Sequence, residues 1–134
     1  MLKIGKPRTS KGLATFCARI ADEKLARNIL IIDLTKIETA PTSFFVICTC
    51  DSENQSLAIA EAIVDMCRQL EIQKPRLEGI DSRQWILLDF FDVVVHVMLQ
   101  NIRDYYKIER LWGDGRLYSI NESGRVVAFS LSRS

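Results

Sequence analysis

The sequence predicts an α/β domain in which one mixed β-sheet of about five strands carries helices packed on it. Several short segments are continuously apolar and rich in β-branched or aromatic residues, as in strands covered on both faces. Between them lie longer segments with apolar residues at the three- and four-residue spacing of an amphipathic helix. The 134 residues, of which 48% are hydrophobic, suit one domain with a real core.

The first predicted elements are a helix and two buried strands. A helix is predicted to run to about Leu25, because apolar residues recur on one face, and Thr9 or Ser10 can cap its start. The segments ILIIDL (29–34) and FFVICTC (44–50) lack polar alternation, so they are predicted to be strands inside the sheet.

A second helix and a short extended piece are predicted next. Ser52 and Gln55 match the capping box, in which a serine and a glutamine three residues later bond to the first helical turn. Apolar residues at helical spacing continue to about Glu71, and residues 75–78 are predicted to be extended.

The next part of the chain predicts an antiparallel hairpin and a last helix. Residues 85–89 and 92–99 are apolar, and the gap between them is so short that the two strands should pair. A helix is predicted over 101–112. The element order is therefore α-β-β-α-β-β-β-α, and both faces of the sheet should be substantially covered.

Both ends of the chain are predicted to lie outside this domain, which is placed at residues 9–113. Residues 1–8 are predicted to form a flexible arm. For the C-terminal extension, residues 114–134, a small hairpin and a partly disordered segment are equal alternatives. The hairpin alternative rests on a Glu-Ser-Gly turn signal at 122–124 between two apolar stretches.

Composition and charge exclude several functional classes. The formal net charge is +1, whereas nucleic-acid-binding domains usually carry a marked basic excess. Direct DNA binding is therefore not expected, and any partner should be contacted through a protein surface rather than through bare nucleic acid. No apolar stretch has the length of a membrane span or a signal peptide. Buried, reduced thiols in a cytoplasmic protein are expected for the four cysteines, Cys17, Cys48, Cys50 and Cys67.

No catalytic or metal-binding constellation is predicted. His96 is the only histidine, and Cys48 and Cys50 lack the two further ligands that zinc needs. A Cys–His nucleophilic pair has no activating neighbour in the sequence. Asp89 and Asp92 are the type of residue that holds magnesium, but their i, i+3 spacing favours turn and strand-end aspartates. We therefore expect no cofactor, no metal and no enzymatic activity.

The hairpin and the last helix have the composition of a protein-binding surface. Tyr106 has Arg103 and other basic residues within helical reach, and mixed aromatic and arginine surfaces are typical of binding hot spots. If the faces of the two hairpin strands coincide, Trp85 and His96 share one face. Core packing and a partner interface are equal alternatives at this point.

Three stretches also carry a family resemblance. The strongest is WILLDFFDVVVHVMLQNIRDYYKIERLW, residues 85–112, and FFVICTCDS (44–52) and the Glu78–Gly79 pair support it. In the strongest stretch the matching positions are Trp85, Asp89, Asp92, Val95, His96, Val97, Arg103, Tyr106, Glu109, Leu111 and Trp112. In these positions the chain resembles the Iojap family, the ribosomal silencing factors called RsfS. It departs from the family pattern at Ser43, Cys50, Asn54 and Phe91.

The resemblance implies a fold similar to nucleotidyltransferases but without their catalytic carboxylates. It implies that the protein binds the large ribosomal subunit through ribosomal protein number fourteen, sterically blocks association with the small subunit and represses translation. It also implies that a homodimer can form. The predicted partner-binding residues are Trp85, His96, Arg103, Tyr106 and Glu109, with Trp85 and Tyr106 as anchors that Arg103 and Glu109 orient.

Two other functions remain as alternatives. A nucleotidyltransferase-like, nucleotide-binding enzyme would need several acidic groups in one pocket. A dimeric interaction module would use the same surface for a non-ribosomal partner. Exposure separates contact residues from structural ones, since a side chain that is buried in the monomer cannot touch a partner.

Overall fold

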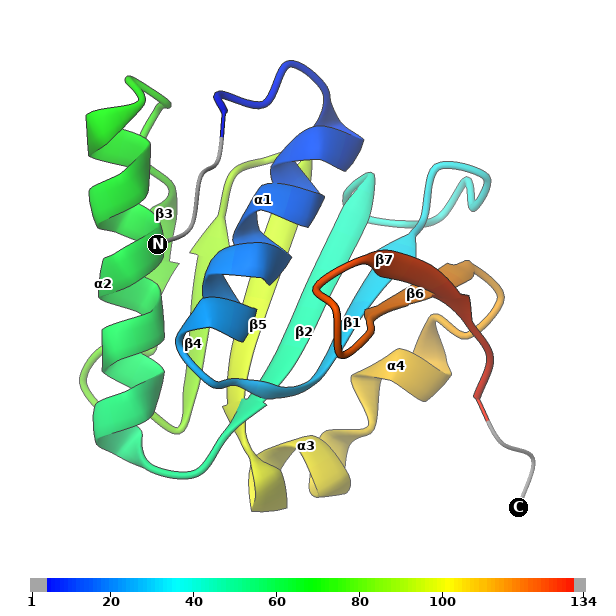
Figure 1. The fold of residues 1–134 in the computed structure, drawn as a ribbon. Helices are drawn as coiled ribbons and strands as arrows, with labels where there is room; N and C mark the ends of the chain where they lie inside the picture. The colour runs from blue at the N-terminus through cyan, green and yellow to red at the C-terminus, as the bar shows by residue number, and fades with distance from the viewer. Residues whose placement is uncertain (1–4, 132–134) are drawn as a thin grey trace.

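The computed structural model describes residues 5–131, which form four helices and one seven-stranded sheet (Figure 1). The helices are α1 (Ser10–Glu23), α2 (Glu53–Gln69), α3 (Gln100–Tyr106) and α4 (Ile108–Leu111). The strands are β1 (Arg27–Asp33), β2 (Phe44–Cys50), β3 (Arg76–Glu78), β4 (Trp85–Asp89), β5 (Val93–Leu99), β6 (Arg116–Ile120) and β7 (Val126–Phe129).

Strands β5, β2 and β1 form the centre of the sheet, whose strand order is β3-β4-β5-β2-β1-β6-β7. β2 pairs with β5 in parallel, and the other neighbouring pairs are antiparallel. Every residue of β2 is buried, because the strand has neighbours on both sides and helices over both faces. This position accounts for the uninterrupted apolar run in its sequence.

Helices α1 and α2 cover one face of the sheet (Figure 1). Both helices begin after a residue whose side chain caps the first helical turn. The Thr9 hydroxyl accepts a hydrogen bond from the Gly12 N–H, and the Ser52 hydroxyl accepts one from the Gln55 N–H. The predicted capping box is only half formed, since the Gln55 side-chain oxygen accepts from the Asp51 N–H.

The other face of the sheet is covered only in part. α3 and α4 pack over its centre, where a second apolar cluster is buried. Its buried members are Ile32, Leu34, Phe45, Ile47, Met98 and Leu117. On the same face of β4, Trp85 and Leu87 remain partly exposed. The predicted coverage of both faces is therefore correct for the central strands and wrong for β4.

The helix predicted over 101–112 is in fact two helices, α3 and α4. Lys107 separates them with φ 47° and ψ 47°, a left-handed conformation that ends α3 and precedes α4. Neither glycine nor proline marks this break in the sequence. The break accompanies a set of tertiary contacts at Arg103 and Glu109, which are part of the candidate site.

The sheet has seven strands rather than about five. The two additional strands, β6 and β7, form a hairpin within the predicted C-terminal extension, residues 114–134. β6 pairs with β1, from Arg116 opposite Asp33 to Ser119 opposite Leu30. The hairpin alternative for this extension is therefore the one that the chain adopts in residues 116–129.

The termini are described in part. Within the predicted N-terminal arm, residues 1–4 lie outside the described residues, and residues 5–8 form neither a helix nor a strand. Residues 132–134 also lie outside. Among the helices of residues 5–131, none combines the length and apolar character that crossing a membrane requires.

Phe91 lies at the tip of the β4–β5 hairpin with φ 78°, and its side chain is 88% exposed. A side chain in left-handed backbone costs roughly 1–2 kcal/mol, and an exposed ring has little packing to offset this cost. We expect Phe91→Gly to raise the free energy of unfolding by about 0.5–1 kcal/mol, because glycine adopts this φ without strain. Urea denaturation measures the change.

Phe91→Ala is the matched control for this prediction. It removes the ring but keeps the unfavourable φ, so it should leave the free energy of unfolding nearly unchanged. An equal gain from both variants would show that the ring, not the backbone, is the source of the strain.

Candidate functional site

The structure brings the five predicted partner-binding residues to the face of the sheet opposite α1 and α2. They are Trp85 on β4, His96 on β5, Arg103 and Tyr106 on α3, and Glu109 on α4. In the hairpin register Leu87 lies opposite His96, so the two strand faces coincide as the sequence suggested. The site therefore combines two neighbouring strands with the α3–α4 segment.

Trp85, His96 and Tyr106 form one connected aromatic group. The indole Nε1 of Trp85 donates a hydrogen bond to Nδ1 of His96 at 3.1 Å. The ring centroids of Trp85 and Tyr106 are 5.0 Å apart, and the Tyr105 ring packs edge-on against Tyr106 at 4.9 Å. The Trp85 indole is thus held by a hydrogen bond to the sheet and by ring packing against α3.

Four side chains at this place reach the surface, and we call them the aromatic patch: Trp85, Leu87, Tyr105 and Tyr106. Tyr105 is 80% exposed and Tyr106 is 53% exposed, whereas Trp85 and Leu87 are half-buried. Tyr105 was not among the predicted contact residues. The sequence could have indicated its exposure, because Tyr105 and Tyr106 are adjacent in the helix. Adjacent side chains on a helix point about 100° apart and cannot both face the core.

His96 is buried behind the aromatic patch, with 7% of its surface exposed and the Phe45 ring edge-on at 4.6 Å. Burial lowers the pKa of His96 from 6.5 to about 4, so its ring is neutral near pH 7. Because Nδ1 accepts from Trp85, the proton of the neutral ring is assigned to Nε2. Nε2 has no hydrogen-bond partner within the described part of the chain.

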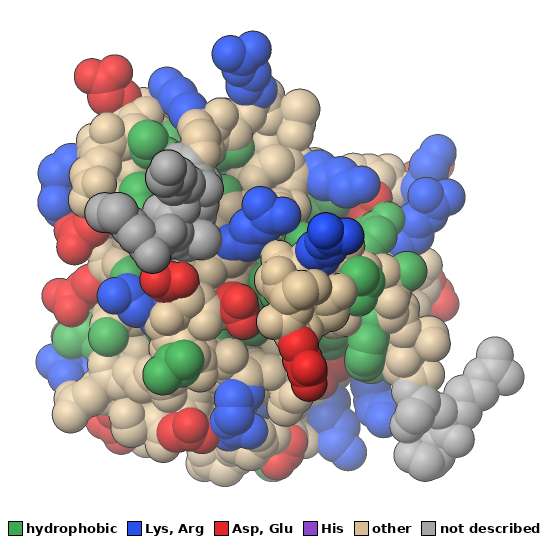
Figure 2. Space-filling model, viewed as in Figure 1, with side chains coloured by type: hydrophobic (Ala, Val, Ile, Leu, Met, Phe, Trp, Pro, Cys, Tyr) green, Lys and Arg blue, Asp and Glu red, His purple; other side chains and the backbone are tan. Residues whose placement is uncertain are grey.

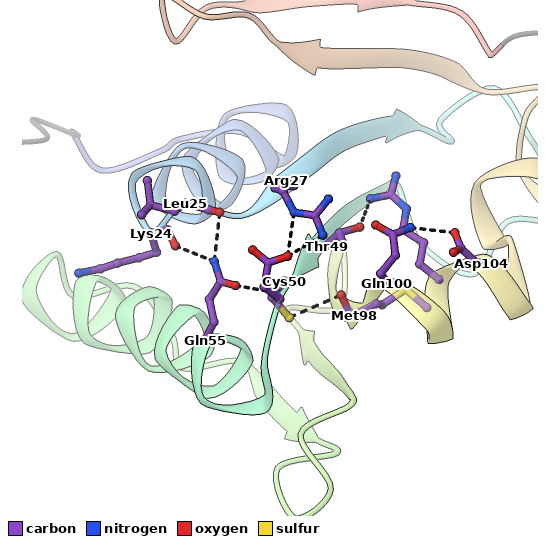
Figure 3. Close-up of polar contacts among 11 residues, drawn as sticks. Lys24, Leu25, Arg27, Thr49, Cys50, Gln55, Met98, Gln100 and Asp104 are labelled. Carbon is purple, nitrogen blue, oxygen red and sulfur yellow. Dashed lines mark hydrogen bonds and ion pairs between the residues drawn. The ribbon is translucent and has the colours of Figure 1, made fainter.

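Arg103 is also buried, with 5% of its surface exposed, and it joins four elements. Its Nη1 donates to the Thr49 hydroxyl of β2 at 2.9 Å (Figure 3) and to the Asn28 carbonyl of β1. A bulge in β1, where Asn28 has φ 50°, accompanies this contact. The Arg103 Nε donates to the Glu109 carboxylate at 3.4 Å, which ties α3 to α4.

The Arg103–Glu109 contact explains why the helix breaks at Lys107. In a continuous helix, residues six apart point about 120° apart around the axis and lie about 9 Å apart along it, so their side chains could not meet. The left-handed Lys107 redirects the chain, and Glu109 then reaches Arg103. The same change of direction lets Trp112 pack edge-on over Phe45 at 6.1 Å.

Burial divides the predicted residues into two groups. His96 and Arg103 are buried, and the Glu109 side chain is only 17% exposed, so they offer a partner little surface. Trp85 and Tyr106 reach solvent and can touch a partner directly. The arrangement is a rigid apolar surface held by a buried polar group, which suits binding by shape complementarity.

The groups that suggested catalysis have structural partners. Asp89 accepts from the Phe91 N–H and pairs with the arginine of β3, and Asp92 accepts from the Ser10 hydroxyl. Across residues 5–131, no three His, Cys, Asp or Glu side chains gather closely enough to hold a metal ion. The four cysteines are buried and free, and burial raises the pKa of Cys48 to about 12, far from a reactive thiolate.

Comparisons with known proteins agree on one family. The family model described as "Ribosomal silencing factor during starvation" matches residues 7–130. The chain is 38% identical over 111 residues to the ribosomal silencing factor RsfS of Bacillus subtilis (strain 168), covering 83% of this chain and 93% of that relative. It is 32% identical over 90 residues to a Mus musculus protein named mitochondrial assembly of ribosomal large subunit protein 1, covering 65% of this chain and 39% of that relative.

The fold of the chain is also similar to that of a protein whose structure has been solved. The crystal structure of a protein from Chromobacterium violaceum matches with a TM-score of 0.74 and 31% sequence identity. The match covers 79% of this chain and 88% of the other. The mixed sheet with its helices is therefore shared with a relative of known structure.

Replacing Arg103 should be among the most destabilising changes on this face. Arg103→Met leaves the buried Glu109 carboxylate without its counter-charge and removes the donor to Thr49 and Asn28. We expect the free energy of unfolding to fall by about 3–4 kcal/mol. Urea denaturation followed by circular dichroism measures the loss.

The double variant Arg103→Met/Glu109→Leu is the control for this prediction. It removes both charges, so part of the lost stability should return. A double variant as unstable as the single one would mean that the unpaired carboxylate is not the cause.

The low pKa of His96 predicts a specific dependence of stability on pH. An unfolded chain protonates its histidine near pH 6.5, whereas folded His96 does so only near pH 4. Between these values the unfolded state binds more protons. The contribution of His96 is therefore complete above pH 6.5, declines by about 1.4 kcal/mol per pH unit below it, and is lost below pH 4.

His96→Gln isolates this contribution, because all other titrating groups are shared with the wild type. The difference in unfolding free energy between wild type and variant should shrink by roughly 3 kcal/mol as the pH falls from 6.5 to 4. Denaturation curves at several pH values measure it. A difference that stays constant with pH would contradict the assigned burial of a neutral imidazole.

Proposed function

Because the chain belongs to the family of ribosomal silencing factors, we propose that it binds the large ribosomal subunit and keeps the small subunit from joining. The proposed contact is ribosomal protein number fourteen, which the Iojap resemblance implies. The proposed action is steric, requires no catalysis and takes place in the cytoplasm. Its result is repression of translation.

The aromatic patch is the observation that carries this proposal. Tryptophan and tyrosine side chains dominate the binding energy of many protein interfaces, because each buries a large rigid surface at little cost in conformational entropy. Here Tyr106 is 53% exposed and lies against a half-buried Trp85. Such a group, beside the part of β4 that α3 and α4 leave partly exposed, has the composition and geometry expected of an interface centre.

The choice of the large subunit rests on the family and on one relative. The name of the Mus musculus relative assigns that protein to assembly of the large ribosomal subunit. We extend this association to the present chain. Since its formal net charge is only +1, a ribosomal protein is a better contact than bare RNA.

A small protein is sufficient to block subunit joining. A standard protein interface buries about 800 Å² on each partner, roughly a tenth of this chain's accessible surface of 8200 Å². Most of the molecule would therefore project from the large subunit. If the binding surface on the large subunit faces the small subunit, the projecting protein occupies the space that the small subunit needs for joining.

The five predicted residues receive two kinds of role in this proposal. Trp85 and Tyr106 act as anchors. His96 fixes the plane of the Trp85 indole through the hydrogen bond to Nδ1, and Arg103 with Glu109 fixes the α3–α4 segment that carries Tyr106. A homodimer that covers the same patch would compete with the ribosomal partner.

Tyr106→Ala should weaken binding to the large subunit without unfolding the chain, because the ring is half exposed and lies at the end of α3. We expect the dissociation constant to rise by about 10- to 30-fold. Co-sedimentation of the purified protein with purified large subunits measures it. The same variant should lose inhibition of subunit joining in a gradient assay.

Phe91→Ala is the matched control, since Phe91 is an exposed aromatic residue at the tip of the β4–β5 hairpin, beyond the end of β4 opposite to Trp85. It should bind like the wild type. Unchanged binding of Tyr106→Ala would place the interface elsewhere, and a folded wild-type protein that does not co-sediment would refute the proposed function itself.

A further inference from the structure

The basic residues of this chain are unevenly distributed along the sequence. Residues 1–21 contain five lysines and arginines and no aspartate or glutamate. The remaining residues, 22–134, contain 13 basic and 17 acidic residues. The net charge of +1 therefore conceals a first segment of +5, and such an asymmetry is typical of a segment that meets a polyanion.

The structure places the beginning of this segment at one end of the molecule. In Figure 1, the start of α1, the end of α2 and the turn between β4 and β5 lie together at the top of the view. Figure 2 shows that Lys and Arg side chains predominate over Asp and Glu side chains in the upper part of the same view. Arg8, Lys11 and Arg19 are exposed, and within residues 5–131 they form no ion pair.

Three adjoining hollows form one groove around the start of α1, and we call it the basic groove. The first hollow lies beside the β4–β5 turn, the second beside residues 6–10 and the third along the exposed side of α1. The first two share Leu13 and Asp92, and the last two share Pro7 and Thr9, so the hollows are contiguous. The basic side chains that line the groove are Lys6, Arg8, Lys11, Arg19, Lys74 and Arg76.

Positive charge exceeds negative charge along the basic groove. Its acidic side chains are Glu71, Asp89 and Asp92, so basic residues outnumber acidic ones by six to three. Asp89 is paired with Arg76 at 3.3 Å, and Asp92 accepts a hydrogen bond from the Ser10 hydroxyl. A groove with such an excess attracts a chain of negatively charged groups.

An exposed aromatic ring lies at one end of the basic groove. Phe91 is 88% exposed, has φ 78° and lines the same hollow as Lys74 and Arg76. The left-handed backbone costs stability, and the exposed ring packs too little within the chain to offset that cost. Backbone strain of this kind persists chiefly at functional sites. The ring is therefore a candidate contact for a ligand of the groove.

We propose that the basic groove binds single-stranded RNA, with phosphates along its lysines and arginines and one base stacked on Phe91. Sites for single strands combine a positively charged groove with aromatic side chains on which bases stack. A double helix keeps its bases paired inside and offers none to Phe91. An anionic membrane fits less well, because Phe91 is the one large apolar side chain of the groove that is exposed and a membrane anchor needs more apolar surface.

The basic groove and the aromatic patch lie apart. α1 covers the sheet face opposite the patch, and Phe91 lies beyond the end of β4 opposite to Trp85. The chain can therefore hold a protein at the patch and an RNA strand in the groove at the same time. The inference goes beyond the proposed function, and each can fail without the other.

Fluorescence anisotropy with a labelled oligouridylate of about twelve nucleotides tests the proposal on the full chain. Because the net charge of the whole chain is low, we expect weak binding, with a dissociation constant of about 10⁻⁵ to 10⁻⁴ M at low salt. The logarithm of the binding constant should fall with the logarithm of salt concentration with a slope of about −2 to −3. Such a slope corresponds to roughly three or four phosphate contacts on a single strand.

Two variants test the stacking on Phe91. Phe91→Gly should raise the dissociation constant for the oligouridylate at least about fivefold, because no ring remains for the base. The same variant is expected to be more stable than the wild type, so unfolding cannot explain the loss. Phe91→Trp keeps an aromatic ring and should bind at least as tightly as the wild type.

A charge variant tests the phosphate contacts. Lys11→Gln/Arg19→Gln should weaken binding about tenfold and reduce the steepness of the salt dependence by about 1.4, the value for two contacts. Lys36→Gln/Arg110→Gln is the matched control, since it changes the net charge equally at two exposed residues that do not line the groove. It should keep the wild-type affinity within about twofold and the wild-type slope.

Three results would overturn the proposal. One is a wild type that does not bind the oligouridylate at its highest soluble concentration, and another is Phe91→Gly that binds like the wild type. The third is an equal loss in both double variants, which would mean that net charge alone drives binding. Binding to phosphatidylserine vesicles without binding to the oligouridylate would assign the groove to a membrane and overturn the proposal as well.

Two cross-measurements separate the groove from the proposed function. Phe91→Gly should co-sediment with large subunits like the wild type, because Phe91 is remote from the aromatic patch. Tyr106→Ala should bind the oligouridylate like the wild type. If Tyr106→Ala loses the oligouridylate and Phe91→Gly keeps it, the RNA contact lies at the patch and the proposal for the groove is wrong.

Discussion

The buried guanidinium of Arg103 is the contact on which the shape of the partly covered sheet face, opposite α1 and α2, depends. It links the bulged strand β1, the central strand β2 and both C-terminal helices through hydrogen bonds to Asn28, Thr49 and Glu109. A buried charge is tolerated only when its partners are in place, so this position specifies one arrangement of α3 and α4. The positions of Tyr105 and Tyr106 therefore depend on the polar contacts of Arg103, two and three residues earlier in α3.

The two faces of the sheet are stabilised by different kinds of interaction. Under α1 and α2, the core is made of aliphatic, phenylalanine and cysteine side chains, and burial of apolar surface accounts for its stability. The other face also has a buried apolar cluster, but there the buried polar groups His96 and Arg103 lie beneath or beside exposed aromatic side chains. Polar contacts are directional, whereas apolar packing tolerates small shifts. The face with directional contacts is the one that carries the proposed binding surface.

The sequence predicted those parts of the fold that local patterns determine. The limits of β2 and β4 and the N-terminal caps at Thr9 and Ser52 follow from apolar runs and capping residues. The break at Lys107 did not follow, because helical periodicity continues through it and a tertiary ion pair overrides it. For the candidate site, composition and the family resemblance suggested the residues, which stay a prediction. Burial of Arg103 and His96 depends on how α3 and α4 close over the sheet, which no local pattern records.

The hydrogen bond from Trp85 to His96 also limits what the tryptophan can do at an interface. Indole has a single polar hydrogen, and here it points inward to the imidazole. Any molecule that docks on this residue meets carbon and ring electrons alone. Recognition there must come from contour and from the quadrupole of the ring, so selectivity for one partner has to be supplied by groups at the rim.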